Sequence, residues 1–246
     1  MNTSASAGAT PDWRAVPLGD GALHIEFGRT AEPTFQRRAR ALSRALGEAD
    51  LPGLLDHLPS YAAVLVRYDP DRLTHDDLLA AVAALIGHAD TGATAGTTWR
   101  VPVCYDPTVA EDIAEAADVL GISVDALVRA HTGTRFEIAL YGFAPGWAYL
   151  AGCPDSLNLP RRERPRPPTP DDAVMIAGGQ AMITARSMPT GWYVIGRIAQ
   201  PTLQLDANPP VSFDVGDSVQ FDAVGLDDWQ ALYARARNGE RVATPL

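Results

Sequence analysis

The sequence contains no lysine, because all 20 of its basic residues are arginine. This absence excludes three kinds of chemistry for the chain itself: biotin carried on a lysine, a lysine Schiff base, and the phosphate-binding lysine of a P-loop. If a nucleotide is involved, its phosphates must be held by arginines, by backbone amides or by another polypeptide.

Cysteines and long apolar runs are also scarce. Cys104 and Cys153 are the two cysteines and lie far apart, which predicts reduced thiols and no disulfide. No apolar run approaches the roughly 20 residues that span a bilayer, and residues 1–9 lack the basic start and apolar core of a signal peptide. The five histidines are scattered, so no metal site is expected. We therefore expect a cytoplasmic protein without membrane contact.

Charge is unevenly distributed along the chain. The net charge is -10, yet residues 142–197 hold six arginines against four acidic residues, a local charge of +2 that leaves -12 elsewhere. A basic cluster on an acidic protein favours binding of a small carboxylate or phosphate, or of an acidic partner surface. Nucleic acid is not expected as a partner, because it would require a broad basic face.

The apolar pattern predicts an α+β protein of two domains. Residues 1–12 are small and polar and predict a disordered tail, and residues 91–98 predict a linker. Between them, residues 13–90 predict an α/β domain of ferredoxin-like order: strand, helix, strand, strand, helix. These elements are expected near 23–27, 35–46, 54–58, 62–68 and 74–86.

Residues 99–246 form the second predicted domain. A strand over 99–105 is followed by a helix that Gly121 ends and by a second helix that Ser123 caps. Short apolar runs separated by turns then favour an antiparallel β-barrel or sandwich, with a closing helix over 228–237. The expected strands are 174–176, 182–184, 193–195, 203–205 and 219–221.

Glycine, proline, arginine and aromatic residues cluster between residues 142 and 197, at positions that regular secondary structure would not choose. Gly142, Pro145 and Gly146 predict either backbone amides presented to an anion or a rigid turn. Phe143 and Trp147 predict either pocket walls or core residues, and Trp192 is placed with the binding residues.

Polar side chains of the same segment supply the predicted chemistry. Arg161, Arg162 and Arg166 predict anion capture, a partner contact or a solvated charged surface. Gln180 follows Gly179 and can both donate to and accept from a lactam or a urea-like group. The other two candidates are Arg197, either an anion anchor or half of a structural ion pair, and His131, either an acid-base group or a helix cap.

The chain resembles the family of the 5-oxoprolinase B subunit, also met as allophanate hydrolase subunit 1 and as the Kip-type inhibitor of a sporulation histidine kinase. The resemblance rests on ordered motifs: Gly142-Phe143-Ala144-Pro145-Gly146-Trp147, Pro160-Arg161-Arg162, Pro165-Arg166, Ile176-Ala177-Gly178-Gly179-Gln180, Gly191-Trp192 and Gly196-Arg197. It implies an N-terminal α/β domain followed by a C-terminal cyclophilin-like β-barrel. The sequence departs from the family pattern at Asp172-Ala173, Thr184-Ala185 and Thr190.

The resemblance also implies an activity and partners. It implies the ATP-dependent opening of 5-oxoproline to glutamate, with ATP and Mg held by the complex and no biotin on this chain. The implied partners are a homologous carboxyltransferase-like barrel protein, of the type of the 5-oxoprolinase C subunit, and a LamB/YcsF-like protein that is the A subunit. The alternatives are a kinase-inhibitor protein of the Kip type and a carboxyltransferase-like component of a urea or allophanate pathway.

Overall fold

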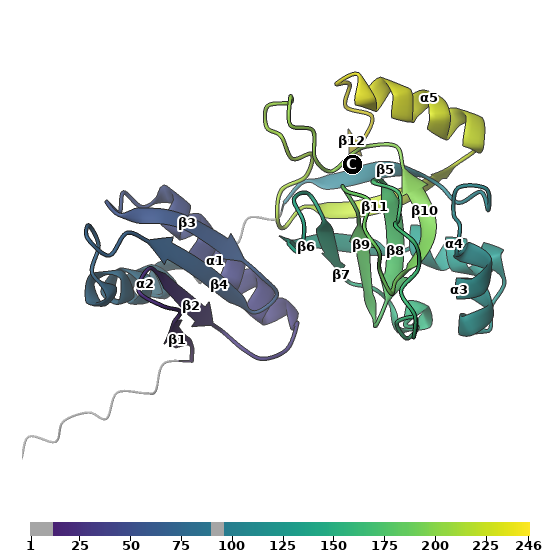
Figure 1. Cartoon of the computed structure of the whole chain (residues 1–246). Helices are drawn as coiled ribbons and strands as arrows, with labels where there is room; N and C mark the ends of the chain where they lie inside the picture. The colour runs from purple at the N-terminus through teal and green to yellow at the C-terminus, as the bar shows by residue number, and fades with distance from the viewer. Residues whose placement is uncertain (1–11, 90–95) are drawn as a thin grey trace, which may run out of the picture. The chain divides into compact units, whose positions relative to one another are not determined.

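The computed structural model describes residues 12–89 and 96–246. The chain divides into two compact units, Met1–Thr94 and Ala95–Leu246, each with a hydrophobic core of its own (Figure 1). Most of the predicted tail over residues 1–12 and of the predicted linker over residues 91–98 lies outside the described residues.

Unit 1 is an antiparallel sheet of strand order β1-β2-β4-β3 with two packed helices. The elements are β1 (Arg14–Pro17), β2 (Ala22–Glu26), α1 (Pro33–Glu48), β3 (Leu54–Pro59), β4 (Ala63–Tyr68) and α2 (His75–Ala89). Strand β4 lies between β2 and β3, which is the ferredoxin-like arrangement. Strand β1 was not expected from the sequence and occupies the edge beside β2.

Local sequence signals explain these elements. Successive side chains of a strand point to opposite faces of the sheet, so Leu23 and Ile25 of β2 share one face. Both are fully buried in the core of unit 1. Helix α2 begins after Thr74, whose hydroxyl accepts from the backbone amide of Asp77 (3.2 Å) and donates to its carboxylate (2.7 Å). The helix cap predicted at Thr74 is confirmed.

Unit 2 is a closed barrel of seven strands in the order β10-β8-β9-β7-β6-β11-β5, with β5 pairing back to β10. The strands are β5 (Thr98–Cys104), β6 (Arg135–Tyr141), β7 (Ala148–Ala151), β8 (Ala173–Ala177), β9 (Gln180–Ile183), β10 (Tyr193–Ile198) and β11 (Ser218–Val224). A short strand, β12 (Thr244–Pro245), also pairs with β5. The predicted α+β class with a β-barrel is confirmed.

One pair of barrel strands departs from the antiparallel expectation. Strands β5 and β11 run parallel over seven residue pairs, from Thr98 opposite Ser218 to Cys104 opposite Val224. Every other neighbouring pair in the barrel is antiparallel. The first and the last strand of the barrel are therefore neighbours in the wall.

The helices of unit 2 follow their predicted signals. They are α3 (Ile113–Leu120), α4 (Val124–Thr132) and α5 (Leu226–Arg237), with a 3-10 turn at Asp155–Leu157. Gly121 ends α3 in the left-handed conformation (φ 68°), and the Ser123 side chain accepts from the amide of Ala126 at the start of α4. Trp229 of α5 packs against Cys104 of β5. Both cysteines are free.

The strand predicted over residues 203–205 is wrong. Leu203 makes an isolated bridge to Val211, and the segment forms a loop between β10 and β11. Pro209 and Pro210 follow closely, and proline has no backbone N–H for a ladder.

The wall formed by β7, β9, β8 and β10 is apolar on both faces. Val174 and Ile176 of β8 point into the barrel core. Met175 alternates with them and belongs to a second cluster on the outer face. The buried members of this outer cluster are Trp147, Ala173, Met175, Ala177, Met182, Trp192 and Val194. A strand buried on both faces needs a cover on its outer side, and the loops from the glycine- and arginine-rich segment supply it.

Candidate functional site

The loops over the outer cluster are tied to one another by backbone hydrogen bonds. Arg162 donates to the carbonyl of Gly191 (2.8 Å), and Arg166 donates to that of Thr190 (2.8 Å). The segments around residues 160–170 and 185–192 therefore run side by side. Thr184, one of the departures from the family pattern, is buried and donates to the carbonyl of Pro170 (2.8 Å).

Two aromatic rings meet above this face. Tyr149 lies on β7 and Trp192 just before β10, so two strands separate them, a span of about 14 Å at the usual strand spacing. Their ring centroids are nevertheless 6.3 Å apart and nearly perpendicular. The rings therefore lean toward each other across β9 and β8. Arg161 places its guanidinium 5.4 Å from the Trp192 ring.

Gln180 joins this group through a tight hairpin. Gly178 and Gly179 both have positive φ (58° and 71°) and connect β8 to β9 in a two-residue turn, a conformation that glycine adopts without strain. Gln180 is thereby placed opposite Ala177 on the outer face. Trp192 precedes Tyr193, the partner of Ile176, and so flanks Ala177 on the other side. The structure thus brings Gln180, Trp192 and Arg161 to one end of the wall.

Tyr149 was not among the predicted site residues. It follows the motif of residues 142–147 by two positions, and no local pattern indicates that its ring meets Trp192. Half-burial raises the pKa of its hydroxyl, and nearby Arg161 partly opposes this shift. The ring therefore acts at neutral pH as an apolar wall with an uncharged hydroxyl.

Arg197 does not lie with Gln180. It pairs with Ala173, whereas Gln180 pairs with Ala177, so the length of β8 separates them by about 13 Å. Its guanidinium contacts the buried carboxylate of Asp172 and lies 5.3 Å from the Trp229 ring. Burial raises the pKa of Asp172, and Arg197 offsets part of that rise. Of the two roles predicted for Arg197, the structure fits half of a structural ion pair and not an anion anchor.

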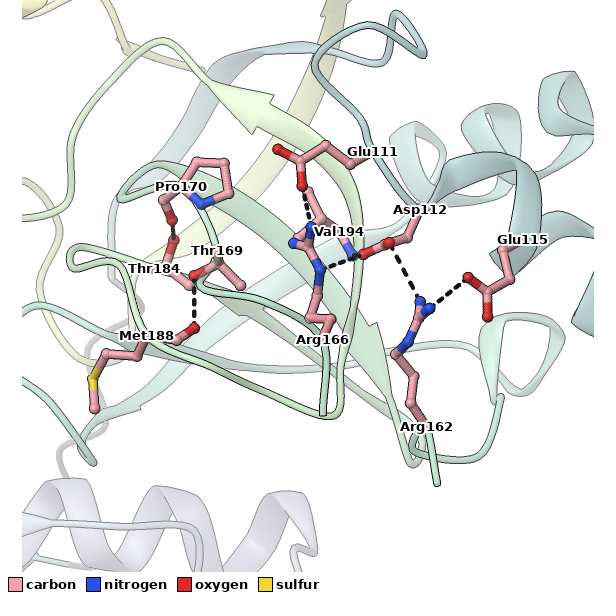
Figure 2. A network of polar contacts seen from close by, with 10 residues as sticks. All are labelled: Glu111, Asp112, Glu115, Arg162, Arg166, Thr169, Pro170, Thr184, Met188 and Val194. Carbon is pink, nitrogen blue, oxygen red and sulfur yellow. Dashed lines mark hydrogen bonds and ion pairs between the residues drawn. The ribbon is translucent and has the colours of Figure 1, made fainter. Parts of the chain in front are cut away.

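Arg162 and Arg166 are also paired internally, as Figure 2 shows. Arg162 contacts Glu115 (2.7 Å) and Asp112 (3.3 Å). Arg166 contacts Glu111 and, through Nε, Asp112 (3.1 Å). These carboxylates come from the start of α3, so the arginines fix the loop of residues 160–170 to that helix. The prediction that both capture an external anion is not supported by this geometry.

His131 lies in the barrel core. Its ring stacks on Phe221 (4.6 Å), and Nδ1 lies 2.7 Å from the Tyr105 hydroxyl. Complete burial lowers its pKa from 6.5 to about 3. The ring is therefore neutral and out of reach of a substrate, which does not fit the predicted acid-base role.

The turn of residues 142–147 is rigid. The amide of Gly142 donates to the carbonyl of Trp147 (3.1 Å), so it is already paired. Trp147 is buried in the outer cluster and donates from Nε1 to the carbonyl of Arg186 (3.3 Å). Pro145 has no N–H to offer. Gly142 therefore fits the predicted rigid turn, and Trp147 is a core residue. Phe143 is exposed.

Gly146 predicts a strong response to one added methyl group. Its φ is 76°, and a Cβ there would lie 2.5 Å from the Cβ of Leu203 and 2.7 Å from that of Ala185. We expect Gly146→Ala to lower the free energy of unfolding by about 2 kcal/mol more than Gly239→Ala, measured by urea denaturation. Gly239 has the same unfavourable sign of φ (89°) but open space around it. An equal loss of unfolding free energy in the two variants would contradict the close packing of Gly146 against Leu203 and Ala185.

Most of the arginines predicted to bind an anion are paired with carboxylates of this chain. Three of the four arginines offered for anion binding are paired with carboxylates, which leaves Arg161 without one among residues 12–89 and 96–246. Within the same residues, no group of three potential metal ligands comes together. The described helices also include none whose length and apolarity would let it cross a bilayer.

Comparison with known proteins identifies related chains. The family described as carboxyltransferase domain, subdomain C and D, matches residues 13–213. The B subunit of the 5-oxoprolinase of Bacillus subtilis (strain 168) is 27% identical over 236 residues, which cover 90% of this chain and 97% of that protein. The protein of the same name from Haemophilus influenzae is 26% identical over 86% of this chain and 98% of its own.

Solved structures agree with the fold. The protein TTHA0988 superposes with a TM-score of 0.74 at 33% identity and covers 82% of this chain. This chain corresponds to only 39% of the TTHA0988 chain. The urea amidolyase of K. lactis superposes with a TM-score of 0.72 at 15% identity, a likeness that concerns the fold alone.

Proposed function

The chain belongs to the family of the carboxyltransferase domain, subdomains C and D, and from this premise we propose that it is a subunit of an ATP-dependent 5-oxoprolinase. The observation that carries the proposal is the correspondence with three curated proteins that are each named as the B subunit of 5-oxoprolinase. The match extends over 94–98% of the length of those proteins.

The proposed enzyme works as a complex. A protein named as one subunit implies companions, and we take these to be a homologous barrel protein of the C-subunit type and a LamB/YcsF-like protein as the A subunit. The pairing of Arg162, Arg166 and Arg197 with carboxylates favours an ATP and Mg site held by the complex, not by this chain alone. ATP would supply the energy for opening a stable lactam.

The outer barrel face offers groups that match 5-oxoproline. The substrate is a small ring with one lactam group and one carboxylate. Arg161 is suited to the carboxylate, and the Gln180 amide can donate to the lactam oxygen and accept from the lactam N–H. Tyr149, which is only partly buried and rests against the Trp192 ring, provides an apolar surface for the ring carbons. In this role the residues bind and orient the substrate for chemistry that the whole complex performs.

Turnover of the reconstituted complex tests this assignment. We expect Arg161→Ala and Gln180→Ala each to lower ATP-dependent glutamate formation about tenfold or more, because each removes one hydrogen-bonded anchor from the substrate. The matched controls are Arg129→Ala on α4 and Gln230→Ala on α5, exposed residues for which turnover should stay unchanged.

The outcomes separate the alternatives. Absence of ATP-dependent glutamate formation by the wild-type complex would reject 5-oxoproline as the substrate and favour a kinase inhibitor or a urea-pathway protein. Wild-type turnover in both outer-face variants would keep the enzyme but reject the outer face as its substrate site.

A further inference from the structure

The hydroxyl of Tyr149 has no hydrogen-bond partner in the part of the chain that the structure describes, although the side chain is partly buried. Two other tyrosines of unit 2 differ in this respect. The Tyr105 hydroxyl lies 2.7 Å from Nδ1 of His131. The Tyr141 hydroxyl donates to the carbonyl of Phe213 (2.7 Å). Tyrosine hydroxyls that leave bulk water usually find a partner, so the Tyr149 hydroxyl is suited to a ligand.

The strand register directs Tyr149 toward the end of the wall that holds Gln180. Tyr149 is the partner of Met182 on β9, and Gln180 lies two residues before Met182, so Tyr149 and Gln180 are diagonal neighbours on the outer face. Such neighbours are about 7–8 Å apart, within reach of an aromatic side chain. The Tyr149 ring also meets Trp192, which flanks Ala177, the partner of Gln180. The ring therefore leans toward Gln180.

Arg161 brings a second donor to the same place. Its guanidinium lies 5.4 Å from the Trp192 ring, which Tyr149 also contacts. Burial raises the pKa of the Tyr149 hydroxyl, and the positive charge of Arg161 is close enough to oppose part of this rise. Unlike Arg162 and Arg166, Arg161 has no carboxylate partner among the described residues. A neutral O–H and a guanidinium, both donors, therefore lie together, and such a pair matches a carboxylate.

We propose that the Tyr149 hydroxyl is a specificity-determining donor that binds the carboxylate of the substrate together with Arg161. The inference rests on the proposed function, because it assigns a residue to one of the two polar groups of 5-oxoproline. The other polar group, the lactam, is bound by Gln180, whose amide both donates and accepts. In 5-oxoproline the carboxylate is attached to the ring carbon next to the lactam nitrogen, so the two groups are neighbours, as Tyr149 and Gln180 are on the outer face. The site therefore selects a lactam with a carboxylate beside its nitrogen over the same ring without one.

Tyr149→Phe tests the inference, because it removes the hydroxyl and keeps the ring against Trp192. In the reconstituted complex we expect the KM for 5-oxoproline to rise about tenfold while kcat changes less than about twofold, because the lost hydrogen bond holds the carboxylate equally before and during the reaction. The inhibition constant of 2-pyrrolidinone, the same lactam without the carboxylate, should stay unchanged. This second measurement separates the loss of a carboxylate contact from a disturbance of the whole site, which would weaken the binding of both compounds.

The matched control is Tyr233→Phe, which removes the hydroxyl of another partly buried tyrosine, on α5 beside Trp229. Its KM for 5-oxoproline should equal that of the wild type. An unchanged KM in Tyr149→Phe, or an equal weakening of 2-pyrrolidinone binding, would overturn the role of the hydroxyl while the 5-oxoprolinase assignment stands. If the wild-type complex forms no glutamate from 5-oxoproline, the proposed function and this inference fail together.

Discussion

Replacing Asp112 with alanine is expected to lower the free energy of unfolding by about 3 kcal/mol, because the change removes a buried carboxylate that two arginines share. Asp112 is buried, contacts Arg162 and Arg166, and accepts from the backbone amide of Val194 (2.8 Å). The variant leaves the nearly buried Arg166 with Glu111 alone and an amide of β10 without its acceptor.

Glu115→Ala is the matched control for Asp112→Ala. Glu115 contacts the same Arg162, but its side chain is half exposed, so water replaces it and the loss should stay below about 1 kcal/mol. Urea denaturation of both variants measures the difference. Similar losses would show that the buried network at the start of α3 does not fix the loop of residues 160–170.

Acidification is expected to destabilise the protein strongly through His131. Its pKa is about 3 in the folded barrel, against about 6.5 in an unfolded chain. Below pH 6.5 the unfolded state binds a proton that the folded state cannot accept. The stability from the neutral ring is therefore complete above pH 6.5 and is lost progressively toward pH 3, by on the order of 4 kcal/mol.

A double variant isolates this effect. His131→Phe combined with Tyr105→Phe removes the titrating ring without leaving a buried hydroxyl unpaired. We expect its free energy of unfolding to fall less than that of the wild type between pH 7 and pH 4.5, measured by urea denaturation at each pH. His75→Gln in unit 1 should keep the wild-type profile. Identical pH dependence of the double variant and the wild type would contradict the core position of His131.

Local chemistry made much of the fold predictable. The cap at Ser123, the left-handed stop at Gly121 and the alternation of β2 depend on neighbours in sequence, and all appear as expected. Strand β7 was missed because four residues inside a glycine- and aromatic-rich motif give too short an alternation. The parallel pairing of β5 with β11 joins residues about 120 positions apart, which no local pattern reveals.

The site was predictable in its residue types but not in its pairings. The arginines of residues 161–166 suggested anion capture, yet two of them contact carboxylates in or just before α3, roughly 50 positions earlier. Gln180 and Arg197 were both candidate site residues of the segment from residue 142 to residue 197. Register separates them, since the Gly178-Gly179 hairpin returns Gln180 to one end of β8 while β10 carries Arg197 to the other. Sequence order alone cannot fix that register.

The neighbouring positions of β5 and β11 also set the order in which the molecule can be made. Strand β11 lies between β5 and β6, so the wall stays open until residue 224 has been synthesised. The described hydrophobic core of unit 1 is formed by residues 13–86, so we expect this unit to fold while translation continues. A premature stop between residues 199 and 217 would therefore leave a complete first unit joined to an open barrel wall. Strands β5 and β6 would each lack the neighbour that β11 provides, and unpaired strand edges are surfaces on which nascent chains aggregate.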